Sequence, residues 1–110
     1  MASKLDRNGY AKSIMATTAG ECYLCGYVGE TARHEVFYGT GTRALSKRYG
    51  LWVNLCPRCH AEVHAHPESD KADTLDTDAR EAFIAQGHSL AEFRKIFVTG
   101  NVKHWELENE

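Results

Sequence analysis

The chain has 110 residues, of which 43% are hydrophobic and 25% charged, and its formal net charge is −2. These values predict one small globular domain with a modest core. No run approaches about eighteen consecutive apolar residues, which excludes a transmembrane helix, and residues 1–13 lack the apolar run of a signal peptide. We therefore expect a cytoplasmic protein. In a reducing compartment, four cysteines in two pairs indicate a metal site before disulfides.

Charge is unevenly distributed along the chain. Residues 31–60 carry five basic side chains and one acidic side chain, whereas residues 61–110 carry eleven acidic and five basic side chains. A basic surface that binds phosphates is thus compatible with a negative net charge of the whole chain. A solvated helix would give the same charge pattern. The side chains that we assign to nucleic-acid binding are Arg43, Lys47, Arg48 and Arg58.

The first part of the chain predicts turns and short strands. Residues 1–20 have no strong periodicity and form either a loose arm or a short helix. The segment ECYLCGYVGE (21–30) predicts a two-cysteine turn, which we call a knuckle. Residues 34–38 and 51–55 contain the β-branched and aromatic residues typical of strands.

A short helix is predicted on each side of the second strand. Between the strands, Thr42 is expected to cap a helix over residues 43–49 that Gly50 ends. After the second strand, Pro57 suits the first position of a helix that continues to His66.

Two further helices are expected after an acidic linker. Thr74 can cap the first helix, which has an apolar face and ends at Gly87. Ser89 and Glu92 form a capping-box pattern for the second helix, which ends at Gly100. The chain therefore divides into an N-terminal arm (1–20), a core (21–66), a C-terminal helical segment (67–100) and a tail (101–110).

The cysteines form two C-x2-C knuckles with thirty residues between them. Four thiolates complete the tetrahedral coordination of a structural zinc. A redox function would need only one such pair, and a two-cysteine, two-histidine finger would leave the second pair without a role. The sequence thus predicts one structural Zn²⁺, worth on the order of 10 kcal/mol of folding free energy in small zinc modules, held by Cys22, Cys25, Cys56 and Cys59.

Three histidines remain for a second metal. His60 and His64 are spaced i, i+4, so they share one face of the predicted helix. Two imidazoles on one helical face make half of a metal site, and His34 on the first predicted strand could supply a third ligand. A surface helix can also carry such a pair without binding metal, so the residue types leave both interpretations open. We expect His66 to face solvent.

The order C-x2-C, histidine, C-x2-C-H-x3-H resembles the HNH endonucleases that carry a four-cysteine zinc. The segment HEVFYGTGTRALSKRYGLWVNLCPRCH (34–60) is more narrowly similar to small phage-encoded HNH proteins. The resemblance covers roughly residues 20–66 and implies an α+β fold with a ββα-metal core, followed here by two short C-terminal helices. It also implies a metal-dependent endonuclease that hydrolyses DNA phosphodiester bonds with one catalytic divalent cation, such as Mg²⁺ or Mn²⁺.

The resemblance also implies roles for four side chains. His60 and His64 take the helical positions that bind the metal or the scissile phosphate, and His34 and Glu35 take the paired strand positions. Many members have Asp-His in that pair, with the first residue as metal ligand and the second as base. By position, His34 is therefore the ligand and Glu35 the base. By residue type, His34 is instead the base. We expect His34, Glu35 and His64 to be catalytic, and the divalent ion to be held by His34, His60 and His64.

Two departures from the family pattern leave a second interpretation open. The strand pair is altered, and Asn54, the one candidate for the family's central asparagine, lies only two residues before Cys56. With the net acidity, these departures fit a non-catalytic zinc module that binds nucleic acid or protein. Under the first interpretation, we expect the protein to bind DNA and not to associate with a membrane. It would then act inside the bacterial host of a phage. The sequence does not decide between a monomer and a homodimer.

Overall fold

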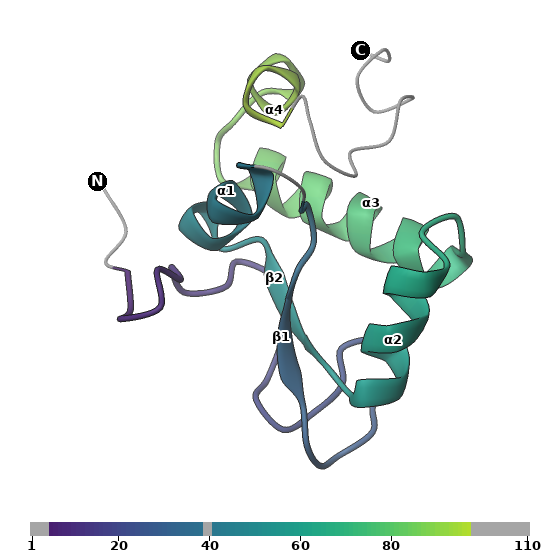
Figure 1. The fold of residues 1–110 in the computed structure, drawn as a ribbon. Coiled ribbons are helices and arrows are strands. Elements are labelled where there is room, and N and C mark those ends of the chain that lie inside the picture. Colours follow the sequence, from purple (N-terminus) through teal and green to yellow (C-terminus); the bar gives the residue numbers. More distant parts are fainter. Residues whose placement is uncertain (1–4, 39–40, 98–110) are drawn as a thin grey trace.

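A two-stranded antiparallel hairpin lies at the centre of the computed structural model, which describes residues 5–38 and 41–97 (Figure 1). His34 lies opposite Val53 in the hairpin, and Glu35 lies opposite Trp52. The fold is α+β, as predicted, and its elements in chain order are β1 (Ala32–Glu35), α1 (Thr42–Tyr49), β2 (Trp52–Leu55), α2 (Pro57–Ala65), α3 (Asp70–Ala85) and α4 (Leu90–Ile96).

Strand β1 begins and ends earlier than the sequence predicts. It covers Ala32–Glu35, whereas the pattern favoured residues 34–38. The N–H of Phe37 bonds to the Ser46 hydroxyl at 3.0 Å, and this hydroxyl donates back to the Phe37 carbonyl at 2.6 Å. Because α1 satisfies these backbone groups, the chain leaves the hairpin after Val36, whose N–H still bonds to the Leu51 carbonyl at 3.0 Å.

Helices α1 and α2 lie close to their predicted positions. Gly41 is the N-cap of α1, so Thr42 is the first helical residue and not the cap that the sequence predicted. Pro57 occupies the start of α2, as predicted, and the preceding Cys56 caps the helix by accepting the Cys59 N–H through Sγ at 3.4 Å. Helix α2 packs against both strands.

Helix α3 begins four residues before the predicted cap. Ser69 accepts the Ala72 N–H through its hydroxyl, and Asp70 and Asp73 lie in the first turn, where the helix dipole favours negative charge. The expected linker over residues 67–73 is therefore partly helical, and Thr74 is not the cap. The acidic residues that suggested a linker, Asp70 and Asp73, instead belong to the first turn of α3.

The capping box of α4 is confirmed. The Ser89 hydroxyl accepts the Glu92 N–H at 3.1 Å, and the Glu92 carboxylate accepts the Ser89 N–H at 2.7 Å. The helix ends at Ile96, earlier than expected; Gly100 and the predicted tail (101–110) lie outside the described residues.

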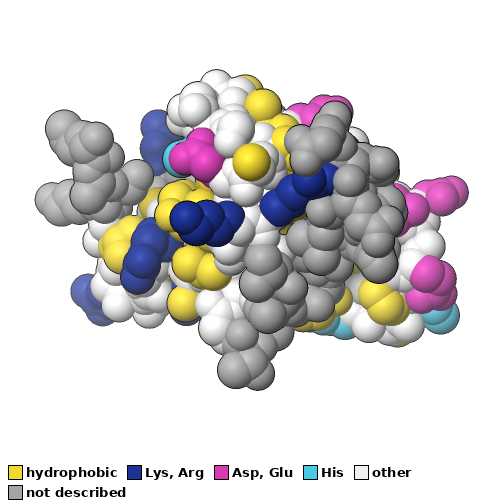
Figure 2. Space-filling view, turned by 90° about the horizontal axis from the view of Figure 1, so that it is seen from above, with side chains coloured by type: hydrophobic (Ala, Val, Ile, Leu, Met, Phe, Trp, Pro, Cys, Tyr) yellow, Lys and Arg dark blue, Asp and Glu magenta, His cyan; other side chains and the backbone are white. Residues whose placement is uncertain are grey.

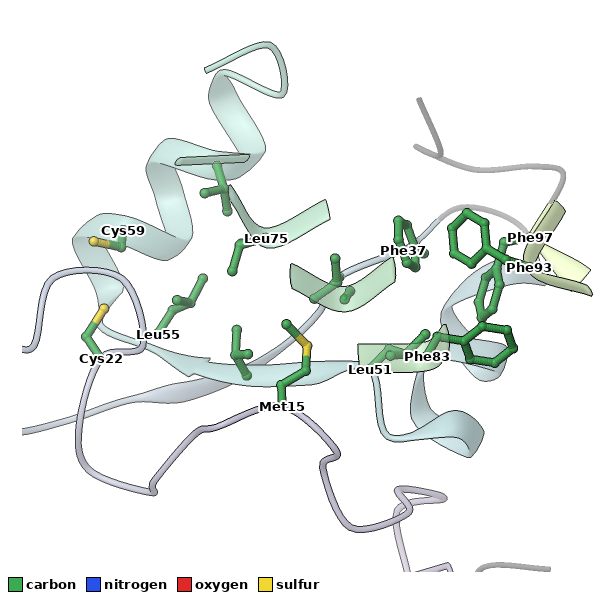
Figure 3. Close-up of a cluster of buried hydrophobic side chains, with 14 of the residues drawn as sticks. Met15, Cys22, Phe37, Leu51, Leu55, Cys59, Leu75, Phe83, Phe93 and Phe97 are labelled. Carbon is green, nitrogen blue, oxygen red and sulfur yellow. The ribbon is translucent and has the colours of Figure 1, made fainter. Parts of the chain in front are cut away.

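The hydrophobic core extends from the cysteines to an aromatic cluster beside α4. Figure 3 shows Cys22 and Cys59 at one end of the buried side chains, and the phenylalanines at the other end. Strand β2 connects the two ends through Val53 and Leu55, both fully buried. The aromatic cluster consists of Phe37, Phe83, Phe93 and Phe97, and it holds α4 against α3 and against the segment that follows β1.

The N-terminal segment is neither a helix nor a loose arm where it is described. Residues 5–20 contain turns and one isolated bridge, and they lie along α1 and β2. The Ala11 N–H bonds to the Lys47 carbonyl at 2.8 Å, and the Trp52 indole N–H bonds to the Ala11 carbonyl at 2.8 Å. Gly50 permits this approach, because a Cβ there would lie 2.4 Å from the Lys12 carbonyl oxygen.

Within the described part of the chain, every helix is too short or too polar to cross a membrane.

Candidate metal centres

The four cysteines form a cluster that could hold one metal ion. Their sulfur atoms all lie within 4.8 Å of one another, and Cys25 Sγ is 3.8 Å from Cys56 Sγ. Zinc–sulfur bonds of about 2.3 Å place the sulfurs of a tetrahedron about 3.8 Å apart, whereas a disulfide needs about 2.05 Å. The cysteines are free thiols in the structure. This geometry is consistent with the predicted structural zinc.

Each knuckle is fixed by the backbone around it. In the first, the Gly26 N–H bonds to the Cys22 carbonyl at 2.9 Å, and Gly26 has φ of 80°, which a residue without Cβ adopts without strain. The second knuckle is the first turn of α2. Cys22, Cys56 and Cys59 are buried, and Cys25 is exposed.

The metal-free cysteines differ in acidity. Burial disfavours the Cys22 thiolate, but backbone N–H groups, including those of Cys25 and Leu24, outweigh burial and lower its pKa to about 6. Burial, followed by the neighbouring thiols, raises the pKa of Cys59 to about 12. The Lys71 ammonium lies 3.6 Å from Cys59 Sγ and can offset part of the negative charge of a four-thiolate site.

Three histidines form a second cluster, beside the first. His34 on β1 faces His60 and His64 on α2, with ring centroids 5.1 Å from each, and the ligand nitrogens of all three lie within 4.8 Å of one another. Three imidazoles at this separation fit a single ion, with positions left open for other ligands. The structure thus brings together the three histidines that the sequence assigned to a divalent ion.

The environment favours the uncharged form of His34 and of His60. Burial, followed by the neighbouring imidazoles and Arg43, lowers the pKa of His34 to about 3. Burial also lowers the pKa of His60, and the charge of Glu35 acts in the opposite direction. A neutral imidazole is the form that binds metals, so His34 and His60 are in the ligand form at neutral pH.

The histidine cluster opens into a cleft of about 700 Å³. Two tyrosines that sequence reasoning did not assign to the site lie along it. Tyr38 packs its ring 5.1 Å from His64, and Tyr10 comes from the N-terminal segment. Tyr38 was predicted only as part of a strand, and no local pattern marked Tyr10. The cleft is lined by Tyr10, Ala32, Arg33, His34, Glu35, Tyr38, Arg43, Pro57, His60, Ala61 and His64.

Glu35 lies at the cleft but outside the histidine cluster. Neighbouring strand residues point to opposite faces, so His34 faces α2 while Glu35 faces the N-terminal segment. The Glu35 carboxylate accepts a hydrogen bond from the Tyr10 hydroxyl and forms an ion pair with Arg43 Nε at 3.2 Å. Its proposed role as a base is therefore not supported by a contact with His34.

Asn54 also contacts the N-terminal segment. It is buried, its side-chain amide lies 3.3 Å from the Thr17 hydroxyl oxygen, and its backbone N–H bonds to the same oxygen at 2.8 Å. These contacts tie residues 5–20 to β2. They give Asn54 a structural role at this contact.

The four predicted nucleic-acid contacts are not equivalent. Arg43 lines the histidine cleft, whereas Arg58 lies in a second hollow that shares Pro57 with the first. Lys47 donates to the Asn8 carbonyl at 3.1 Å, and Arg48 is exposed on α1. Figure 2 shows one face of the molecule, on which several lysine and arginine side chains lie together and most acidic side chains lie toward one edge.

His66 is exposed at the end of α2, as predicted, 3.6 Å from the Glu68 carboxylate.

Comparisons of this chain with protein-family models, with curated proteins and with solved structures find no match.

Proposed function

We propose that this protein is a metal-dependent DNA endonuclease of the HNH type, which hydrolyses phosphodiester bonds with one divalent ion. The observation that carries the proposal is the convergence of His34, His60 and His64 in an open cleft beside the four-cysteine cluster. The order of β1, β2 and α2 around that cluster supports the same function, because it agrees with the ββα-metal arrangement that the resemblance implies.

The donor set suits catalysis better than a structural role. Three imidazoles would hold the ion and leave positions for water and a phosphate oxygen, whereas structural sites use four protein ligands. When bound, the ion would lower the pKa of a water molecule and neutralise charge that develops on the phosphate. Burial lowers the pKa of His34 to about 3, which makes its imidazole a weak proton acceptor and favours the role of ligand over that of the base. Imidazole ligands also favour ions softer than Mg²⁺.

DNA is the proposed substrate because positive charge lies next to the histidines. Arg43 lines the same cleft, and its charge acts on both His34 and His60. Arg58 lines the neighbouring hollow that shares Pro57 with this cleft, so it adds a second basic group. Such groups contact phosphates without reading sequence, which fits cleavage of a backbone bond.

Plasmid cleavage tests the proposal. The parent protein should cut DNA with Mg²⁺, Mn²⁺ or Ni²⁺ and fail without a divalent ion. His34→Ala and His64→Ala should abolish cleavage while keeping the fold and the zinc; His60→Ala should weaken activity, partially if water replaces the imidazole. His66→Ala, at the C-cap of the same helix but outside the cluster, is the matched control and should cut like the parent. The proposed endonuclease activity would be refuted if the His34 and His64 variants cut DNA as well as the parent does, or if the parent never cuts.

A non-catalytic zinc module that binds nucleic acid or protein is the second candidate. It is favoured by the contacts of Glu35 and Asn54, both of which are bound to the N-terminal segment instead of to the histidines. This candidate predicts DNA or protein binding that survives His64→Ala and needs no added divalent ion. The plasmid assay separates the two candidates.

A further inference from the structure

Tyr10 carries the N-terminal segment to the edge of the histidine cleft. Its backbone N–H bonds to the Asp6 carboxylate at 2.9 Å, and its ring meets the edge of Trp52 at a centroid distance of 5.5 Å. The Arg33 guanidinium lies over the same ring, 4.3 Å from its centroid. These contacts fix the ring on the face of the hairpin opposite α2, so the direction of its hydroxyl is fixed too.

The hydroxyl of Tyr10 belongs to a three-residue network. It donates to Glu35 Oε2, while Arg43 Nε lies 3.2 Å from Glu35 Oε1. Each of the two Glu35 oxygens thus has one of these partners, and the Glu35 side chain is only 11% exposed. A carboxylate held from both sides in this way is oriented and has little freedom to approach a water molecule near His34.

Arg43 is the member of the network that faces outward. Its side chain is 60% exposed and lines the cleft, and in residues 5–38 and 41–97 Glu35 is its one ion-pair partner. The contact uses Nε and leaves the two terminal nitrogens of the fork for another group. A planar guanidinium whose two terminal NH2 groups are free can bind two oxygens of a phosphate.

We propose that Tyr10 is a positioning residue that acts through Glu35 to fix the Arg43 guanidinium for a DNA phosphate beside the histidine cluster. The inference rests on the proposed function. It makes Glu35 a member of this network and not the general base. It also gives the N-terminal segment, which lies outside the resemblance, a part in substrate binding.

Tyr10→Phe tests the network with little change in packing. The substitution removes the hydroxyl and keeps the ring that contacts Trp52 and Arg33. Tyr23→Phe is the matched control, because the Tyr23 hydroxyl also donates to a carboxylate, that of Asp78 at 2.6 Å, away from the cleft. Both variants should fold and retain zinc, and only Tyr10→Phe should affect DNA.

The readouts are the Kd for a short DNA duplex, measured by fluorescence anisotropy without added divalent ion, and the KM and kcat of cleavage. Tyr10→Phe and Glu35→Gln should each raise Kd and KM about three- to tenfold and leave kcat within about twofold. Arg43→Ala should have at least as large an effect. In the Arg43→Ala background, Tyr10→Phe should have no further effect, because its only route to DNA is through Arg43.

Three results would overturn the inference. The first is that Tyr10→Phe binds and cuts DNA like the parent. The second is that the increases in Kd caused by Tyr10→Phe and Arg43→Ala add fully in the double variant. The third is Glu35→Gln abolishing kcat at unchanged KM, which would make Glu35 the base. In each case a parent that cuts DNA leaves the proposed function standing, whereas a parent that neither binds nor cuts DNA refutes both.

Discussion

Acidification should destabilise the protein through His34. This imidazole is 3% exposed, and burial, with the neighbouring imidazoles and Arg43, lowers its pKa from 6.5 to about 3. Because the pKa in the folded state is below that in the unfolded state, the unfolded chain binds more protons as the pH falls. The contribution of neutral His34 is therefore complete above about pH 6.5 and is lost progressively toward about pH 3.

The size of the effect follows from the width of that window. Each pH unit inside it costs about 1.4 kcal/mol for one group. Lowering the pH from about 7.5 to about 5 crosses about 1.5 units of the window, so His34 alone should remove about 2 kcal/mol of unfolding free energy. This loss is large compared with the total unfolding free energy of a typical domain, which is about 5–15 kcal/mol.

Urea unfolding at the two pH values, without added divalent ion, measures this loss. His34→Asn removes the titrating group, so the difference between parent and variant isolates the contribution of His34 from everything that the two proteins share. The parent should lose about 2 kcal/mol more than His34→Asn. His66→Asn, at an exposed position, should behave like the parent. Equal losses in the parent and in His34→Asn would refute the reasoning.

Two further predictions concern the zinc and the charged surface. Purified protein should contain about one tightly held zinc per chain, and Cys56→Ser should unfold or aggregate it, because zinc binding is worth about as much as the stability of the whole domain. Elemental analysis and circular dichroism check this, and a disulfide within the cluster would contradict it. Replacing Arg43, Lys47 and Arg48 with Ala should flatten the salt dependence of DNA binding through reduced counterion release. An unchanged slope in a salt titration would count against this surface.

Local signals predicted the elements that carry the candidate centres. The capping box at Ser89, Pro57 at the start of α2 and the i, i+4 spacing of His60 and His64 each act within one or two turns of chain, so sequence alone reveals them. The knuckle spacing also predicted which cysteines meet, because tetrahedral coordination requires four thiolates.

Features that depend on distant contacts were not predictable in the same way. Thr74 was predicted to cap α3, whereas Ser69 caps the helix in the structure. Tyr10 reaches Glu35 across twenty-five positions of sequence. Its place depends on the fit of the N-terminal segment against β2, for which the segment has no periodic pattern.

The two candidate centres share one helical turn, because Cys59 and His60 are adjacent residues of α2. An α-helix rotates by about 100° per residue, so an ion held by the cysteines would set the angular phase of the helix and the direction in which His60 and His64 project. Inserting one residue between Cys59 and His60 would turn both imidazoles away from His34 without changing a single ligand. Changes in chain length should therefore be tolerated in the turn between α2 and α3, and should inactivate the histidine cluster when they fall within this turn of α2.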